Sequence, residues 1–312
     1  MSPDVAASVR ARLLAQARIS GEEFERTLVR FAAERWLYRL GASAARKRCV
    51  LKGASLLTVW LPDPHRATRD VDLLAVGDSD DASIRALITD VCAVPCLEDG
   101  VLFETSELTL EPIRAEEEYP GVRTLFWARL GAARIRMQVD IGYGDAITSE
   151  PEEIEYPSML NPLPTARVQS YPREACVAEK FEAMVKLERR NSRMKDFHDI
   201  YALSVAFPFD GTALRTAVAA CFDRRGTPWT DERPAALTAA FYQDEMLQKR
   251  WRAYLKSGSI LAAPPSRFEE VGEQIIRFLG PVRDSIVAGD LLERLWMSEG
   301  DWIMPNANKK LT

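Results

Sequence analysis

Long hydrophobic runs are missing from this chain, because charged residues interrupt its apolar stretches. A membrane-spanning helix needs about 18 or more consecutive apolar residues, and no segment reaches that length. The N-terminal residues carry scattered charges and no apolar signal core. We therefore expect a cytoplasmic protein with no membrane partner.

Histidine and cysteine are also scarce, with two and five copies in 312 residues, and no two cysteines form a C-x-x-C pair. Zinc sites and disulfide frameworks are therefore not expected, and a reducing compartment is the default. The formal net charge of −5 argues against a generally basic surface for nucleic acid, but not against a local basic groove. Six basic residues could contact phosphate groups in such a groove, although each can equally be ordinary surface charge. They are Arg46, Lys47, Arg48, Arg189, Arg190 and Arg193.

What is present is the composition of an ordinary globular protein, 47% hydrophobic and 28% charged, with enough chain for about two domains. Apolar residues at helical spacing over residues 5–40, interrupted at 19–21, predict two helices. Further helices are expected at 54–61 and 81–93. Strands are expected at 49–51, 70–76, 101–113, 122–130 and 133–143, the last two forming a hairpin around Gly131-Ala132.

These elements predict a two-part architecture. Residues 1–40 are expected to be helices that pack on the core, and residues 41–150 an α+β domain with a mixed sheet. Five prolines between residues 150 and 172 predict an extended linker over 151–171. Residues 172–312 are expected to form a helical domain, and a cleft between the two parts is the expected binding site.

Two aspartates, Asp70 and Asp72, stand at the head of an apolar strand and point to the same side of it. Paired acids are costly in such surroundings unless a divalent cation compensates their charge. In the strand over 133–143, Asp140 lies on the face opposite the apolar row and could supply a third carboxylate. A D-x-D pair alone can be a strand entry with solvated acids. The full set favours one or two Mg²⁺ ions and phosphoryl or nucleotidyl transfer.

A turn of small residues, Lys52-Gly53-Ala54-Ser55, precedes the acidic pair. Gly53 allows the backbone to approach a phosphate closely, and the Ser55 hydroxyl can donate at the start of the following helix. The alternative is an ordinary strand-to-helix turn with Ser55 as its N-cap. Lys52 could contact phosphate or a carboxylate, or could be a surface lysine.

A second constellation lies in the helical half, where Lys180 stands beside the apolar stripe of an amphipathic helix. Such a lysine can stabilise the charge that builds on a leaving pyrophosphate. Asp196 and Asp199 share one helix face and could orient Lys180 or bind the nucleotide. Charge pattern alone is also typical of a solvated, salt-bridged helix face.

Four segments of the chain resemble the AbiEii/AbiGii nucleotidyltransferase toxin family, which belongs to the DNA polymerase β-like superfamily. They are Lys52 to Leu56, "RATRDVDLL" (66–74), "VDIGYGDAI" (139–147) and the long segment 171–203. The resemblance implies a polymerase-β-like palm followed by a helical domain. Two residues depart from the family pattern: Ala54 stands where a second glycine is frequent, and His198 where tyrosine is common.

Carried over residue by residue, the resemblance implies metal-binding and catalytic acids at Asp70 and Asp72, and a catalytic Lys180. The last motif of the family places its aspartate at Asp196 or, preferably, Asp199. The expected nucleotide contacts are Lys52, Gly53, Ser55, Arg66, Thr68 and Asp196; the expected metal ligands are Asp70, Asp72 and Asp140.

The resemblance further implies a toxin of a toxin–antitoxin or abortive-infection system, with Mg²⁺ or Mn²⁺ as cofactor and an NTP as substrate. The leading expectation is nucleotide addition to the 3′ end of tRNA or another RNA, which blocks translation. A cognate antitoxin is implied as partner. Nucleotidylation of a protein or a small molecule, and a non-catalytic regulatory binding module, are the alternatives.

Overall fold

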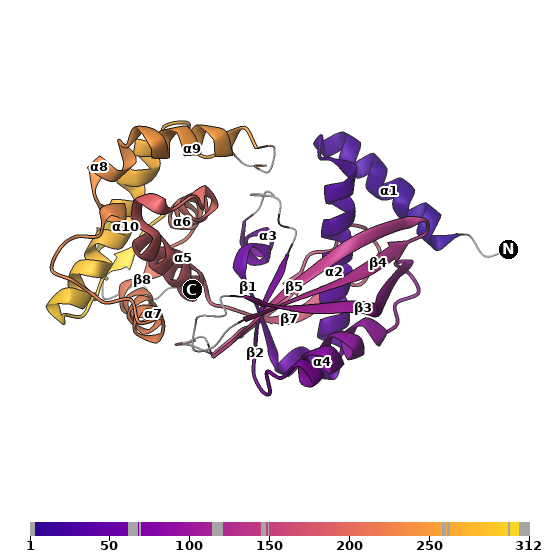
Figure 1. Ribbon diagram of the computed structural model, residues 1–312. Helices are drawn as coiled ribbons and strands as arrows, with labels where there is room; N and C mark the ends of the chain where they lie inside the picture. The colour runs from indigo at the N-terminus through magenta and orange to yellow at the C-terminus, as the bar shows by residue number, and fades with distance from the viewer. Residues whose placement is uncertain are drawn as a thin grey trace. The chain divides into compact units, whose positions relative to one another are not determined.

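Figure 1 shows the computed structural model of the chain, which describes residues 4–61, 68, 70–113, 121–144, 148, 150–257, 260, 263–298 and 300–305. The chain divides into two compact units: residues 1–145 with 151–171, and residues 146–150 with 172–312. None of the helices among the described residues has the length and apolar character needed to cross a bilayer.

The first unit contains a mixed seven-stranded sheet with the strand order β3-β4-β5-β2-β1-β7-β6. Its strands are β1 Cys49–Lys52, β2 Val71–Ala75, β3 Val101–Ile113, β4 Gly121–Leu130, β5 Ala133–Tyr143, β6 Glu152–Tyr156 and β7 Ala166–Ser170. Strand β2 runs antiparallel to β1 and parallel to β5, so the β1–β2–β5 centre of the sheet is mixed.

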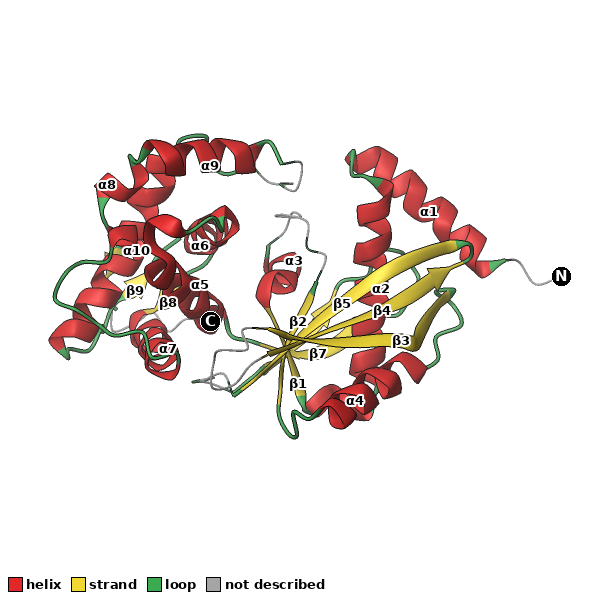
Figure 2. Cartoon of the chain, viewed as in Figure 1, coloured by secondary structure: helices red, strands yellow, loops and turns green. Residues whose placement is uncertain are grey.

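The helices of this unit are α1 Val5–Ser20, α2 Phe24–Ala42, α3 Leu57–Trp60 and α4 Asp81–Ala93, joined by the 3-10 turns η1 Ala44–Lys47 and η2 Gly53–Leu56. Helix α2 packs on β7 and β5, α4 packs on β3, and α1 packs on α2. Figure 2 shows these helices beside the sheet. Alternation in β5 explains the packing, because Ile135, Met137, Val139 and Ile141 are all buried.

The second unit is mainly helical, with α5 Arg173–Leu187, η3 Glu188–Arg190, α6 Met194–Ala206, α7 Gly211–Arg224, η4 Ala235–Leu237, α8 Ala239–Tyr242, α9 Glu245–Leu255 and α10 Phe268–Ala288. Its core is aromatic: the ring of Phe268 lies 5.3 Å from that of Phe197 and 5.1 Å from that of Trp251, between centroids. Three short strands, β8 Phe209–Asp210, β9 Leu295–Trp296 and β10 Trp302–Ile303, form a small second sheet.

The structure confirms the predicted α+β class, with a mixed sheet, flanking helices and a C-terminal helical part. The helix at 81–93 and the strands at 101–113 and 133–143 have the predicted bounds. The predicted helix over 54–61 is instead a 3-10 turn followed by the single turn α3. The small sheet β8–β10 was not predicted, since its strands have only two residues each.

The predicted linker over residues 151–171 is wrong. Strands β6 and β7 lie within it and complete the sheet, β7 pairing in parallel with β1. Proline is tolerated at strand ends and turns, and here Pro157, Pro162 and Pro164 stand between the two strands rather than inside them. Buried Ala166, Val168 and Ser170 alternate with more exposed residues, which is the pattern of a strand.

Candidate functional site

A row of four charged side chains crosses four adjacent strands of the sheet. In the register, Lys52 of β1 stands opposite Asp72 of β2, and Asp72 stands beside Asp140 of β5. Arg123 of β4 stands opposite Asp140. Register partners share a face, so all four side chains project from one side of the sheet. That side is opposite to the buried row Ile135 to Ile141 of β5. The order of charges across the row is plus, minus, minus, plus.

Gly53 is the backbone position on which the Asp72 carboxylate rests. Its φ is +72°, and an added Cβ would come within 2.2 Å of Asp72 Oδ2. An L side chain at residue 53 would therefore be strained by its backbone and would also displace the carboxylate. The turn at Gly53, predicted to contact phosphate, and the strand with Asp72, predicted to bind metal, are therefore in direct contact and form one local structure.

Two hydroxyl groups hold the backbone in front of β2. Ser55 Oγ donates a 3.4 Å hydrogen bond to the carbonyl oxygen of Asp70, and Thr68 Oγ1 donates a 3.3 Å bond to the same oxygen. Ser55 is 2% exposed, so its hydroxyl needs such a partner. The two predicted nucleotide contacts therefore also fix the position of the first acid of the pair.

Asp140 is tied to cationic and amide donors on its own face of the sheet. Arg123 donates to both carboxylate oxygens, from Nε at 3.0 Å and Nη2 at 2.8 Å. Gln138 Nε2 lies 3.1 and 3.2 Å from the same two oxygens. The bidentate bond to Asp140 raises the pKa of Arg123, and the charge of Asp70 acts in the same direction.

The chemistry of the donor set decides how a divalent cation fits. Carboxylate oxygens are the ligands that Mg²⁺ and Mn²⁺ prefer, and Asp72 of β2 and Asp70, just before β2, supply them. The Asp72 carboxylate lies in the space that a Cβ at Gly53 would fill. Within the described residues, no group of three or more His, Cys, Asp and Glu side chains is arranged to hold a metal. The residues present therefore fit a cation held by the Asp70–Asp72 pair, and the metal role of Asp140 stays a prediction.

A second charged cluster lies within the helical unit. Lys180 of α5 places its Nζ 2.7 Å from Asp199 Oδ2 and 3.3 Å from Asp196 Oδ1, both on α6. The lysine side chain is 11% exposed, and both aspartate side chains are fully buried. Arg193 Nε lies 2.9 Å from Asp196 Oδ2 and brings a second cation. Burial of two carboxylates is possible here because two cations meet them.

The surroundings of Lys180 are largely buried and combine a buried thiol with further ion pairs. One turn before it on α5, burial raises the pKa of the Cys176 thiol to about 12, so this thiol stays protonated at neutral pH. Arg225 forms ion pairs with Glu179 at 3.5 Å and with Glu182 at 2.9 Å, on either side of Lys180 in the sequence. His198, the departure from the family pattern, is 2% exposed and its Nδ1 lies 2.8 Å from Tyr254 Oη.

The structure thus gathers the predicted residues into two groups. Lys52, Gly53, Ser55, Thr68, Asp70, Asp72 and Asp140 lie together in the first unit, and Lys180, Asp196 and Asp199 lie together in the second. Arg66 lies outside the described residues. The predicted binding of a nucleotide between the two parts stays a prediction.

Sequence reasoning missed Arg123, although a signal for it was present. Once Gly131-Ala132 is taken as the turn of a hairpin, Leu130 pairs with Ala133 and counting back along β4 places Arg123 opposite Asp140. An arginine opposite the aspartate on the polar face predicts a cross-strand ion pair.

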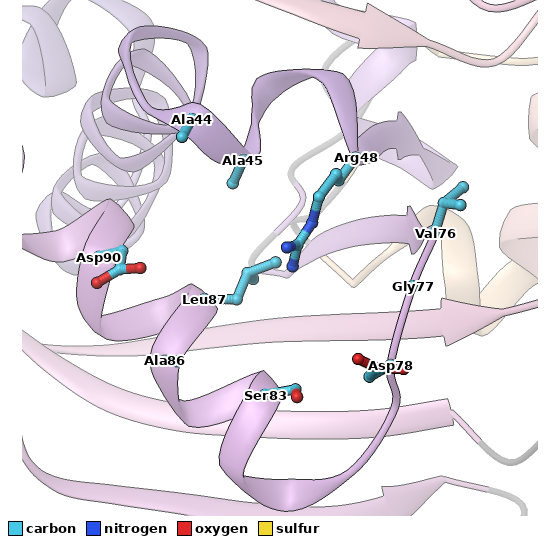
Figure 3. Close-up of a pocket in the computed structure, with 10 residues that line it drawn as sticks. All are labelled: Ala44, Ala45, Arg48, Val76, Gly77, Asp78, Ser83, Ala86, Leu87 and Asp90. Atoms are coloured by element: carbon cyan, nitrogen blue, oxygen red, sulfur yellow. The ribbon is translucent and has the colours of Figure 1, made fainter.

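The structure also has a cavity of about 300 Å³ that the sequence did not predict. Figure 3 shows it between η1, α4 and the segment after β2, with the Arg48 side chain extending into it. Arg48 precedes β1 and Val76 follows β2, so the cavity lies at the end of these strands opposite to Lys52 and Asp72. It is separate from the charged row.

Comparison with known proteins places these features in a family. The family described as "Nucleotidyl transferase AbiEii toxin, Type IV TA system" matches residues 35–274, and no curated protein matches the chain. Among solved structures, JHP933 from Helicobacter pylori is 14% identical with a TM-score of 0.48, covering 82% of this chain and 90% of that one. A candidate nucleotidyltransferase from H. pylori is 13% identical with a TM-score of 0.48, covering 83% and 94%.

The family match spans well over half of the chain and contains both groups of charged residues. It also contains the turn at Gly53 and the β4–β5 hairpin that carries Arg123 and Asp140. The chain therefore belongs to the AbiEii family of nucleotidyltransferase toxins of type IV toxin–antitoxin systems.

Proposed function

We propose that this nucleotidyltransferase uses Mg²⁺ or Mn²⁺ to transfer a nucleotide from an NTP to the 3′-hydroxyl of an RNA, most specifically a tRNA, and so blocks translation. The observation that carries the proposal is the seat of Asp72 on Gly53, beside Asp70. This arrangement offers two carboxylates for a cation, and the lack of a side chain at Gly53 is what allows the Asp72 carboxylate to lie against the backbone there.

In the first unit, Asp70 and Asp72 would hold the divalent cation. When bound, such a cation neutralises triphosphate charge and favours deprotonation of the attacking hydroxyl. The backbone of Gly53 would face the phosphates, and Ser55 and Thr68 would keep Asp70 in place through its carbonyl oxygen. Lys52, opposite Asp72 in the register, would add positive charge at the edge of this site.

In the second unit, Lys180 would stabilise the negative charge that develops on the departing pyrophosphate. Asp199 and Asp196 both contact its ammonium group, so the lysine loses little freedom on binding. The burial of both aspartates strengthens this orientation, because charges interact more strongly away from water.

An RNA acceptor needs positive charge along its path, and several exposed basic residues support one. Lys47 and Arg48 are exposed in the first unit, and Arg190 is exposed in the second. The Arg189 side chain is 67% exposed but lies 3.8 Å from Asp244. Arg46 is paired with Glu153 and Arg193 with Asp196, so these two support an RNA path less well. Phosphate contacts of this kind make binding dependent on salt.

The acceptor is tested by incubating the purified protein with Mg²⁺, total RNA and each of four α-labelled NTPs in separate reactions. We expect label on tRNA, removable by an enzyme that trims RNA 3′ ends. Label that appears on a protein or a small molecule while tRNA stays unlabelled would refute the RNA acceptor. No label on any acceptor would support a non-catalytic binding module. Co-expression with the neighbouring gene tests the antitoxin, which we expect to restore growth.

A further inference from the structure

We propose that Arg123 is a positioning residue that keeps Asp140 away from the divalent cation, so that the cation site of the resting protein consists of Asp70 and Asp72. The inference rests on the proposed function, since it concerns the cation of that same site. It differs from the expectation of three carboxylate ligands, and it assigns a role to a residue that the sequence did not single out.

The geometry of the Arg123–Asp140 pair supports this role. Arg123 meets Asp140 through two donors, Nε at 3.0 Å and Nη2 at 2.8 Å, the fork arrangement in which both carboxylate oxygens accept. Gln138, which is on β5 like Asp140, places its Nε2 3.1 and 3.2 Å from the same two oxygens. For Asp140 to coordinate a cation, it would have to give up at least part of this set of charge-assisted bonds.

The charges of the row across the sheet also support this role. Asp72 and Asp140 are neighbours in a parallel register, so their like charges repel unless each has a cation nearby. Arg123 supplies that cation for Asp140, and Lys52 stands opposite Asp72 on the other flank. Lys52 and Arg123 offset two of the three negative charges of Asp70, Asp72 and Asp140, so one divalent ion already reverses the net charge of these five groups and a second ion is disfavoured.

The Arg123–Asp140 pair is not sealed in the core. The Arg123 side chain is 38% exposed and that of Asp140 is 16% exposed. The charge of Asp70 favours the charged form of Arg123 and raises its pKa, in the same direction as the bond to Asp140. An incoming triphosphate would compete with Asp140 for this exposed guanidinium group.

Binding of Mn²⁺ to the full-length protein without nucleotide tests the proposal, because the free ion is counted directly by electron paramagnetic resonance. We expect wild type to bind through Asp72, with Asp72→Asn abolishing that binding. Asp140→Asn should leave the affinity within about twofold of wild type. Arg123→Gln should raise it about tenfold, since a further carboxylate becomes available to the ion.

The double variant separates coordination from general charge. In Arg123→Gln with Asp140→Asn, the affinity should return to that of wild type; a gain that persists would mean that Arg123 acts only through its charge, and the proposal would be wrong. Arg129→Gln is the matched control, because Arg129 lies on the same strand but pairs with Glu104. It should bind like wild type.

Arg123→Lys keeps the test decisive if Arg123→Gln does not fold. Lysine retains the charge but lacks the fork, so a smaller gain in affinity that Asp140→Asn removes supports the proposal, and no gain contradicts it. Weaker binding in Asp140→Asn, comparable to Asp72→Asn, would show that Asp140 is a resident ligand. That result overturns this inference and leaves the proposed function intact, whereas no Mn²⁺ binding by any variant overturns both.

Discussion

The two charged groups of this protein differ in how they are held. The carboxylates of Asp72 and Asp140 project from one face of the sheet. Asp72 is half-buried against Gly53, and Asp140 accepts a bidentate hydrogen bond from Arg123. The group around Lys180 is closed: its two aspartates are fully buried, and both are ion-paired within the helical unit. The comparison shows that the sheet presents its carboxylates on one face, while the helical cluster buries its two aspartates against the ammonium group of Lys180 and the guanidinium group of Arg193.

This contrast predicts that the two groups respond differently to substitution. A charge on the sheet face can be neutralised at little structural cost, because water and neighbouring charges compensate the change. A charge in the closed cluster cannot, because its partner is left buried and unpaired. Function should therefore separate from stability in the sheet, and the two should fall together in the helices.

The largest effect is expected for Asp72→Asn, which removes a proposed metal ligand while keeping the shape of the side chain. Nucleotidyl transfer should fall on the order of 10³-fold, since a charge that stabilises the transition state is lost. The free energy of unfolding should change by less than about 1 kcal/mol. Expression of the variant should no longer inhibit growth. If growth inhibition persists unchanged in cells, catalysis is not the toxic activity.

Lys180→Met should lower the stability of the helical unit, the other member of the comparison. It removes the cation that lies 2.7 Å from the buried Asp199 and 3.3 Å from the buried Asp196, and we expect a loss of about 3–5 kcal/mol in the free energy of unfolding, measured in urea. Adding Asp199→Asn to this variant should recover part of the loss, because it neutralises the carboxylate that has lost its 2.7 Å contact with Lys180. A stability equal to that of wild type would show that the cluster is not closed.

Gly53→Ala should reduce transfer about 10²-fold, because the new Cβ displaces the Asp72 carboxylate from its position. Gly21→Ala is the matched control: its φ is +69°, close to the +72° of Gly53, but nothing lies within 4 Å of the added Cβ. Both variants should lose about 1 kcal/mol of stability from backbone strain. Equal activity of the two variants would show that Gly53 has no specific role in the site.

The smallest effect is expected for Arg193→Gln, which removes the outer cation of the closed cluster. The Arg193 side chain is 40% exposed and Lys180 remains beside Asp196, so the loss of stability should be about 1 kcal/mol. Urea unfolding measures the free energy of unfolding of this variant and of Lys180→Met, and the two losses are compared. A loss as large as that of Lys180→Met would place Arg193 inside the cluster rather than at its rim.

Much of this fold was readable from the sequence because its local signals agree. Helix α4 has an N-cap at Asp80, which accepts from the backbone N–H of Ala82 and Ser83, and its apolar spacing is regular. The hairpin of β4 and β5 follows from alternation around Gly131-Ala132. The β6–β7 segment was misread because its prolines dominated its composition, although they stand outside the strands.

The site was only partly readable, for a different reason. Asp70, Asp72 and Lys180 belong to motifs, so their residue types and spacing point to them. The contact between Gly53 and Asp72 depends on the β1–β2 register and on the left-handed backbone of Gly53, and neither is a property of a short segment. The role of Arg123 depends on a cross-strand register, which the sequence suggests only after the hairpin turn has been fixed.

The most direct test of the central claim is the fate of the α- and γ-phosphates of the NTP. Wild type and Asp72→Asn are each incubated with Mg²⁺, RNA and an NTP labelled at one phosphate or the other. A nucleotidyltransferase centre at Asp70 and Asp72 predicts that wild type moves the α label to the acceptor and leaves the γ label in pyrophosphate, and that the variant moves neither. Transfer of the γ label, or equal transfer of the α label by the variant, would contradict it.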